Sequence, residues 1–356
     1  MKLALVTDTH AGVRGDNQNF AAYQRKFWRD EFYPRLKAEG ITTIIHLGDI
    51  VDRRKYINFL TAKNLREDVI DPAMAEGYDF HVILGNHDVM FKNTNVVNVM
   101  DQVFADYKHP NLKWYSAAEE VTFDGTKILF LPWINSTNQE ETFNLMRETD
   151  AQIMMGHLEI AGFEMHKGQA SDHGLDMEIF DKFDQVMSGH FHHRSRNRNI
   201  DYLGSPFEMT WSDYNDPKGF HIFDTVTREL EFIENPHRMF RKVYYDDTNR
   251  TIEEATTVPE GMDGSYVKVI VKAKNNPYWF DVYIDKLEKT GVLNVQVVDD
   301  NLNLSFENTE DLVSEAEDTL TIMKSYITQL NVGAEPEVKS LEGLISSLYS
   351  EALTME

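Results

Sequence analysis

Residues 43–53 read TIIHLGDIVDR, and this stretch decides the fold. Its first five residues are mainly apolar or β-branched, which is typical of a strand buried on both faces. Gly48 and Asp49 follow at once, so a sharp turn carrying a carboxylate begins where the strand ends. The same order recurs along the first half of the chain. It predicts an α/β protein whose chemistry lies on loops at strand ends.

Strand and helix patterns alternate on both sides of this stretch. The other buried-strand candidates are apolar runs at residues 3–6, 80–84, 128–131, 153–155 and 185–187. Helical patterns lie at residues 20–37, 61–75 and 96–106, and further strands are predicted at 201–203, 220–224 and 229–233. These segments predict one large α/β sandwich domain over residues 1–236.

The pattern changes after Asn235-Pro236. Residues 237–303 contain the order strand, strand, helix, strand, at 240–245, 266–272, 279–289 and 292–298, which predicts a small α+β module. In residues 304–356, apolar side chains recur at helical spacing on both sides of a break at residues 333–336. This acidic tail is predicted to form two short amphipathic helices.

Composition restricts both chemistry and location. The chain has 356 residues, no cysteine and a formal net charge of −24. Without thiolates, any metal must be held by carboxylate, imidazole, amide or water.

No leader segment is visible, and no apolar run approaches the ~20 residues of a membrane span. We expect a soluble protein of the cytoplasm, the host-cell cytoplasm if a phage encodes it, without a membrane partner.

The acidic charge is unevenly distributed. Residues 299–356 carry thirteen Asp or Glu against two Lys, a net of −11. Proteins that bind nucleic acid through bulk charge contact the phosphates with Lys and Arg, and the total charge argues against that mode. A nucleic-acid substrate would need a local basic surface or a partner that offsets the charge.

Five polar segments each follow a predicted strand. They are Asp8-Thr9-His10, Gly48 to Arg53, Gly85-Asn86-His87-Asp88, Gly156-His157 and Gly189-His190-Phe191-His192. A single histidine at a strand end is more often a hydrogen-bonded structural residue than a ligand. Together the segments supply carboxylates, an amide and imidazoles enough for two divalent cations, and these ligands suit manganese or iron. The glycine before each ligand allows a close approach, although each alone could be an ordinary turn glycine.

The order and spacing resemble the calcineurin-like metallophosphoesterase superfamily, whose pattern is D-x-H, G-D-x-x-D-R, G-N-H-D, G-H and G-H-x-H. Residues 202–206, YLGSP, and 218–220, KGF, resemble its DNA-repair nuclease branch, which contains bacterial SbcD and the meiotic-recombination-eleven nucleases. The chain length and Leu131-Pro132-Trp133 look most like the recombination nuclease subunits of T-even phages. The resemblance covers residues 1–225 and is architectural beyond them. It implies a four-layer α/β sandwich with a small α+β capping domain and C-terminal helices.

This resemblance implies two divalent ions, Mn²⁺ with Mg²⁺ as the alternative. The implied ligands of the first ion are Asp8, His10 and His192, and those of the second are Asn86, His157 and His190. Asp49 would bridge them, because a shared carboxylate offsets the repulsion of cations roughly 3.5–4 Å apart.

Three further residues are implied in catalysis. His87 would contact the scissile phosphate and protonate or stabilise the leaving oxygen, and Asp88 would fix the orientation or tautomer of the His87 ring. Asp52 could support the site in a similar way, but its role stays open. For Asp52 and Arg53 the alternative is a surface ion pair.

The candidate DNA contacts are arginines: Arg53, Arg194, Arg196 and Arg198. The last three alternate after His192, so an extended backbone would place their guanidinium groups on one side, beside the metals. A solvated loop is the alternative. His46, His81 and His221 lie in apolar runs and are expected in the core, whereas His166 and His173 lie in a polar loop and receive no role.

The resemblance also implies function and partners. The chain would be a Mn-dependent nuclease subunit, a 3′-to-5′ exonuclease on duplex ends and an endonuclease on single strands, acting in recombination and double-strand-break processing. Residues 304–356 would bind an SMC-like coiled-coil ATPase of the SbcC type. A nuclease homodimer formed through residues 61–75 and 96–106 would lie within a heterotetramer, and residues 237–303 would contact DNA.

Alternatives remain at this level. The tail helices could pack on their own domain instead of a partner. The metal motifs are shared across the superfamily, so the chain could be a protein phosphatase or a cyclic-nucleotide phosphodiesterase. A non-catalytic scaffold that binds DNA ends is disfavoured, because such a protein would typically have lost ligands or His87, and none is lost here.

Overall fold

The structure is a computed structural model that describes residues 1–107, 109–166, 169–171 and 173–299. The predicted tail helices, residues 304–356, lie outside the described residues, as does the side chain of His166. Within the described ranges, no helix has the length and apolar character to cross a lipid bilayer.

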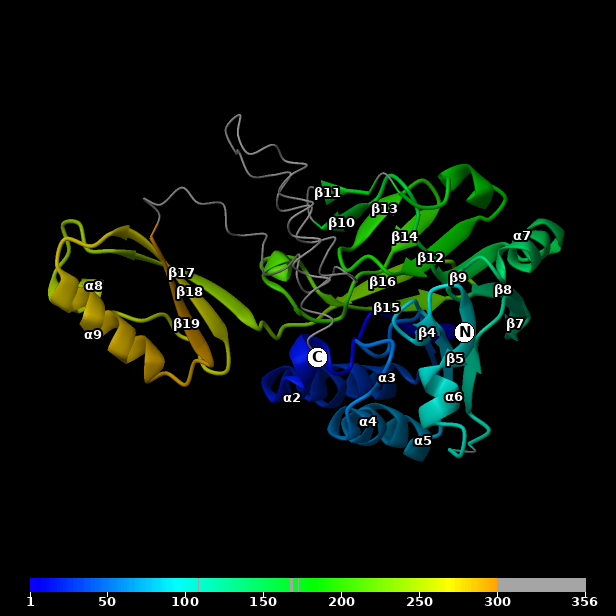
Figure 1. Ribbon diagram of the computed structural model, residues 1–356, viewed down its shortest axis with the longest axis horizontal. Helices are drawn as coiled ribbons and strands as arrows, with labels where there is room; N and C mark the ends of the chain where they lie inside the picture. The colour runs from blue at the N-terminus through cyan, green and yellow to red at the C-terminus, as the bar shows by residue number, and fades with distance from the viewer. Residues whose placement is uncertain (108, 167–168, 172, 300–356) are drawn as a thin grey trace, which may run out of the picture. The chain divides into compact units, whose positions relative to one another are not determined.

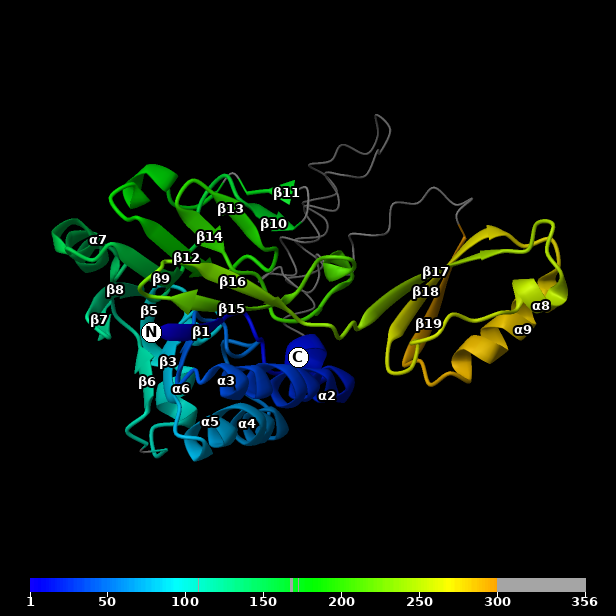
Figure 2. The ribbon, with the colours of Figure 1, turned by 180° about the vertical axis from the view of Figure 1, so that it is seen from behind.

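Two six-stranded sheets form the main body of the described residues (Figures 1 and 2). The first has the order β16-β15-β1-β2-β3-β6 and the second the order β13-β14-β12-β9-β8-β7. The strands of the first sheet are β1 (Lys2–Val6), β2 (Thr43–His46), β3 (Asp79–Ile83), β6 (Leu112–Tyr115), β15 (Gly219–Asp224) and β16 (Leu230–Glu234). Those of the second are β7 (Glu119–Phe123), β8 (Thr126–Leu131), β9 (Ile153–His157), β12 (Gln185–Gly189), β13 (Ser195–Asn197) and β14 (Ile200–Tyr202).

The inner faces of the two sheets pack on each other. Leu5 and Ile45 of the first sheet join Phe130, Met155 and Met187 of the second in one buried cluster. These strands are buried on both faces, which is why they read as nearly continuous apolar runs.

Helices cover both outer faces, so the fold has four layers. Phe32 packs on Phe220 of β15, with 4.8 Å between ring centroids. Met146 of α7 (Gln139–Glu148) joins a second cluster with Leu129 and Met154 of the other sheet. The predicted α/β sandwich is therefore confirmed.

The two long predicted helices are present, each interrupted by a π-helical turn. Residues 18–39 form α2 (Gln18–Lys26), η1 (Phe27–Phe32) and α3 (Tyr33–Glu39), and residues 59–75 form α4 (Phe59–Leu65), η2 (Arg66–Ile70) and α5 (Asp71–Ala75). Pro34 or Pro72 follows each π-helical turn within two residues. A proline has no N–H to donate to the preceding turn, so the turn can widen there.

The helix predicted at residues 96–106 is wrong in its first part. Residues 94–98 form β5 (Thr94–Asn98), which pairs with β4 (Val89–Phe91), and the helix α6 spans only Val99–Val103. The Asn98 side chain accepts a hydrogen bond from the Asp101 backbone at 2.9 Å and so begins the helix there. The β-branched pair Val96-Val97 favours the strand before it.

Residues 240–299 form a separate parallel sheet of order β17-β18-β19. Its elements are β17 (Phe240–Asp246), α8 (Ile252–Ala255), β18 (Tyr266–Ala273), α9 (Pro277–Glu288) and β19 (Asn294–Asp299). Val243, Val269, Phe280 and Leu287 share an apolar cluster of their own. The predicted order of strand, strand, helix, strand is present, while α8 was not predicted. The boundaries proposed at residues 236 and 303 stay predictions.

Candidate metal centre

The carboxyl ends of two sets of parallel strands meet at one place. The five polar segments lie at the ends of β1, β2 and β3 in the first sheet and of β9 and β12 in the second. Hydrogen bonds join their loops. The Asp8 N–H donates to the Gly48 carbonyl at 3.0 Å, and the His190 N–H donates to the Asp8 carboxylate at 3.1 Å. Residues 182 positions apart in the sequence therefore share one cluster.

Carboxylate and imidazole atoms of the described residues gather in three overlapping groups, with each group's atoms within 4.8 Å of one another. The expected ligands form two of them, the ligand groups Asp8, His10 and His192, and Asp49, His157 and His190. The third joins His10 and Asp49 to His87. Asn86 joins the second group, because its Oδ1 lies 3.0 Å from His157 Nε2 and 2.9 Å from His190 Nδ1.

Asp49 lies between the two groups. Its Oδ2 is 3.2 Å from Nε2 of His157 and 3.7 Å from Nε2 of His10. The structure thus brings together all seven residues expected as ligands, in the two expected groups, with the expected bridging carboxylate where the groups meet.

The donor set fits two divalent cations. Burial raises the pKa of Asp8, and the nearby charge of Asp49 raises it further. Burial disfavours protonation of His10, but Asp52, Asp49 and Asp8 together raise its pKa to about 9. Two buried carboxylates this close require positive charge, and oxygen and imidazole ligands without thiolate suit divalent ions.

Four of these residues have a backbone conformation that L residues rarely adopt. The φ angle is +52° at Asp8, +40° at His10, +55° at Asp49 and +93° at His190. A fold retains such strain where surrounding contacts impose it, and strained residues cluster at functional sites. The strain points to this cluster independently of its side chains.

Two glycines are required because ligands lie directly against them. A Cβ on Gly48 would lie 2.4 Å from Nδ1 of His157, and φ at Gly48 is +103°. A Cβ on Gly85 would lie 2.2 Å from Oδ1 of Asp49. A ligand side chain thus packs directly against the backbone of each glycine, as expected from the place of these glycines before the ligands. This contact explains why both positions need glycine.

The imidazoles are oriented from behind by fixed acceptors. The Nδ1–H of His157 donates to the Leu47 carbonyl at 2.8 Å, which leaves Nε2 for the metal centre. The Asp52 carboxylate lies 3.5 Å from Nδ1 of His10. The Asp52 carbonyl accepts a hydrogen bond from Nδ1 of His87 at 2.5 Å. Asp52 therefore supports two imidazoles, one through its side chain and one through its backbone.

Asp88 does not orient His87, contrary to expectation. Its buried carboxylate accepts hydrogen bonds from the backbone N–H groups of Gly85 and Asp49 at 2.8 Å, Ile50 at 2.9 Å and Val51 at 3.2 Å. The turn after β3 directs the carboxylate back at the loop after β2, so Asp88 holds two ligand loops together.

Replacing Asp88 with alanine is expected to lower the free energy of unfolding of the metal-free chain by at least about 3 kcal/mol, because four buried N–H groups lose their acceptor. Urea unfolding measures the change. Asp281→Ala removes an exposed carboxylate from α9 and is expected to change stability by less than about 0.5 kcal/mol. Equal effects of the two substitutions would contradict the role given to Asp88.

Lys218 supports the site in a way that sequence reasoning missed. Its buried Nζ lies 2.6 Å from Asp213 and 2.9 Å from Asp216, and it donates to the His192 carbonyl at 2.8 Å. The Ser205 N–H donates to the same carbonyl at 3.1 Å. Residues 202–206 and 218–220 thus position the loop that carries His190 and His192, which gives these segments a physical reason.

The arginines after His192 do not form one row, contrary to expectation. Arg194 lies over the Phe232 ring at 4.3 Å, Arg196 pairs with Asp201 at 3.6 Å, and Arg198 pairs with Asp181 at 2.6 Å. β13 is only three residues long, and the turn after it gives Arg198 a φ of +54°. Their contact with DNA stays a prediction.

Arg53 and the remaining histidines have local partners. Arg53 lies 3.2 Å from Asp16 and over the Tyr56 ring, so the ion-pair alternative holds for Arg53, with Asp16 rather than Asp52 as its partner. His46, His81 and His221 are buried, as expected. His46 accepts a hydrogen bond from the Gly48 N–H at 3.2 Å, so it supports the ligand loop from within the core. His173 is exposed.

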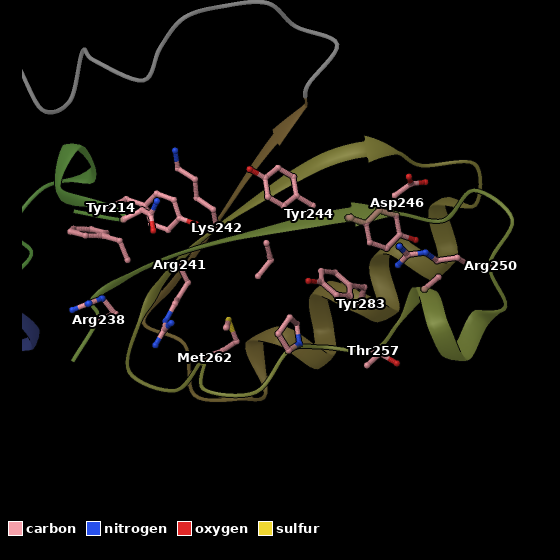
Figure 3. Close-up of a pocket in the computed structure, with 16 residues that line it drawn as sticks. Tyr214, Arg238, Arg241, Lys242, Tyr244, Asp246, Arg250, Thr257, Met262 and Tyr283 are labelled. Carbon is pink, nitrogen blue, oxygen red and sulfur yellow. The ribbon is translucent and has the colours of Figure 1, made fainter. Parts of the chain in front are cut away.

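A basic hollow of about 550 Å³ lies along β17 (Figure 3). Arg241, Lys242 and Arg250 line it together with Tyr244 and Tyr283. Two buried polar atoms in the lining of the hollow, Arg241 Nε and the Tyr245 hydroxyl, have no hydrogen-bond partner among the described residues. In a chain of net charge −24, this hollow is a local site suited to anions, and the sequence analysis did not single it out.

Comparisons with known proteins agree with this geometry. The family model for calcineurin-like phosphoesterase matches residues 1–194. Exonuclease subunit 1 of Enterobacteria phage T4 is 32% identical over 353 residues, which cover 99% of each chain. The SbcD subunit of the SbcCD nuclease of Staphylococcus saprophyticus is 24% identical over 258 residues, 65% of this chain and 67% of its own. The SbcD subunit of Staphylococcus epidermidis is 31% identical over 103 residues, 26% of each chain.

Proposed function

Since this chain belongs to the calcineurin-like phosphoesterase family and hydrolyses phosphodiester bonds, we propose that it is a Mn-dependent DNA nuclease subunit of an ATPase–nuclease complex. The observation that carries the proposal is the pair of ligand groups with the Asp49 carboxylate between them, 3.2 Å from His157 and 3.7 Å from His10. Similarity along the whole chain to a phage exonuclease subunit supports DNA over a phosphoprotein or cyclic nucleotide. We assign it 3′-to-5′ cleavage of duplex ends and cutting of single strands in recombination and double-strand-break processing.

The two ligand groups would hold the two divalent ions, which supply an activated water nucleophile and stabilise charge on the phosphoryl oxygens. His87 then acts at the leaving oxygen. Its Nδ1–H is held by the Asp52 carbonyl, and its N–H donates to Asp49 Oδ1 at 2.7 Å, so the ring has a fixed position. The ring centroid lies 4.8 Å from that of His10, and this proximity to the ligand groups supports the role proposed for His87.

DNA and an ATPase are the proposed partners. The basic hollow along β17 offers Arg241, Lys242 and Arg250 to phosphates, which supports DNA contact by the 237–303 module. Residues 304–356, outside the described residues, are proposed to bind an SbcC-type coiled-coil ATPase. A basic surface on that partner would offset the net charge of −24.

A nuclease homodimer is proposed through α4 and the β4–β5 hairpin. Both expose apolar side chains: Phe59 is 95% exposed, Val96 77% and Phe91 46%. Large apolar side chains exposed in this way are common at protein interfaces. The proposed interface thus includes the hairpin as well as the expected helical segments.

Replacing Phe59 with aspartate is expected to shift the chain from dimer to monomer at micromolar concentration, because a charge would enter the apolar interface. Light scattering after size-exclusion chromatography measures the mass. Val226, 74% exposed at the turn between β15 and β16, provides the matched control, and Val226→Asp is expected to leave the dimer intact. A monomeric unaltered chain would overturn the proposed dimer.

The test of the function is cleavage by the full chain of end-labelled duplex and single-stranded DNA with manganese, magnesium or EDTA. A phosphopeptide and a cyclic nucleotide serve as competing substrates. Manganese-dependent cleavage of DNA, with slow turnover of the other two, supports the nuclease. Faster turnover of phosphopeptide or cyclic nucleotide, with no DNA cleavage even after adding the cognate ATPase, would assign the chain to another phosphoesterase class.

A further inference from the structure

Trp133, two residues after the end of β8, lies beside the second ligand group. Its ring centroid is 5.3 Å from that of His190 and 6.2 Å from that of His157. The ring is half-buried, so part of its surface is available next to the place where a scissile phosphate would bind. The site described above leaves this aromatic surface without a role.

An open hollow of about 210 Å³ begins at the Trp133 ring. Ile134, Phe143 and Leu175 give it apolar walls, and Gln139 and Glu159 add polar groups to its lining, which could accept hydrogen bonds from a base or donate them to it. Pockets for drug-sized ligands are larger, roughly 300–1,000 Å³, so this space suits one small planar group. Since His157 also lines the hollow, such a group would be adjacent to the second ligand group.

Hydrogen bonds fix the backbone of Trp133. Its N–H donates to the Leu84 carbonyl at 2.8 Å, and its carbonyl accepts from the side chains of Asn95 at 2.9 Å and Asn138 at 3.0 Å. Asn135 in turn donates to Asn95 at 2.9 Å. The backbone that carries the ring is thus held in place, which lowers the cost of ordering this segment when a ligand binds.

We propose that this hollow is a nucleobase subsite: the base of a nucleotide flanking the scissile phosphate leaves the stack and packs on Trp133. The proposal rests on the nuclease function above. Its chemistry is the sequence-tolerant stacking of a base on an aromatic ring. An unpaired or frayed strand enters more easily than a paired one, because a paired base must first unstack and unpair. The subsite therefore favours single strands and melted duplex ends.

Binding without catalysis is the first test. Fluorescence anisotropy in EDTA compares a short labelled single strand with the same strand carrying one abasic nucleotide, placed in turn at each position along it. For the unaltered chain, one position is expected to weaken binding on the order of tenfold. Trp133→Ala is expected to weaken binding of the intact strand to the same extent and to be insensitive to the abasic nucleotide. Trp133→Phe keeps a ring and is expected to retain most of the effect.

Cleavage is the second test, with the single strand that carries the abasic nucleotide at the sensitive position as a substrate without a base to stack there. Trp133→Ala is expected to cleave this abasic strand as fast as the unaltered chain does with manganese, while losing about tenfold on the intact strand. An equal loss on both substrates would show that Trp133 only shapes the metal centre and would overturn the subsite. An abasic penalty that persists in Trp133→Ala would overturn it as well. Failure of the unaltered chain to cut any DNA, with bis(4-nitrophenyl) phosphate still hydrolysed, would overturn the nuclease and the subsite together.

Discussion

Replacing Asp49 with asparagine is expected to reduce phosphodiester hydrolysis by at least about a thousandfold and to lower the bound manganese below two ions per chain. The Oδ2 of Asp49 lies between His157 and His10, at 3.2 and 3.7 Å, so its charge is the one shared by both ligand groups. An amide in the same place keeps the shape of the side chain and its bond from the His87 N–H but loses the charge. Elemental analysis of dialysed protein, together with hydrolysis of a small diester, measures both effects.

A comparison with Asp52→Asn separates the bridging role from general loss of acidity. The Asp52→Asn substitution also removes a carboxylate charge, at an oxygen 3.5 Å from Nδ1 of His10. Asp52 belongs to neither ligand group. This variant is expected to keep both ions and to lose less activity than Asp49→Asn. If Asp49→Asn kept two ions and near-normal rates, the bridging carboxylate would be the wrong assignment.

Replacing His87 with alanine is expected to slow DNA cleavage by about 10²- to 10⁴-fold while both ions remain bound. The His87 ring is held by the Asp52 carbonyl, and His87 belongs to neither of the two ligand groups. A proton donor matters most for a poor leaving group. The loss is therefore expected to be larger for DNA, with its alkoxide leaving group, than for a nitrophenyl diester. Rates on the two substrates and the metal content measure the effect.

The metal content decides between two roles for His87. Its ring nitrogen also falls within 4.8 Å of ligand atoms of His10 and Asp49, so it could serve as a ligand. Loss of an ion in His87→Ala, with equal slowing on both substrates, would make it a ligand rather than a catalytic acid. Retained ions with unequal slowing support the catalytic role.

The sequence alone determined the frame of the molecule and its motifs. Strands such as Leu3–Val6 and Thr43–Leu47 were predictable because buried parallel strands need unbroken apolar runs, and such runs are visible locally. The ligand segments were predictable because each lies directly after a strand, where a parallel sheet gathers its loops. The strand before α6 was not predictable. Val96 and Val97 can lie in a helix or in a strand, and the strand is favoured only when β4 lies beside it to form hydrogen bonds.

Only the tertiary structure decided which partner each side chain finds. Asp88 follows His87 in sequence, yet its carboxylate binds backbone N–H groups 37 to 39 residues away, while the Asp52 carbonyl orients His87. Arg198 left the expected row because a short strand ended before it. Lys218, just before β15, and Trp133, just after β8, lie beside the metal centre although they are distant in sequence from most of its ligands. A linear pattern records which groups a chain carries, but hydrogen bonding and stacking act over a few ångströms in space, and that proximity exists only once the two sheets have packed.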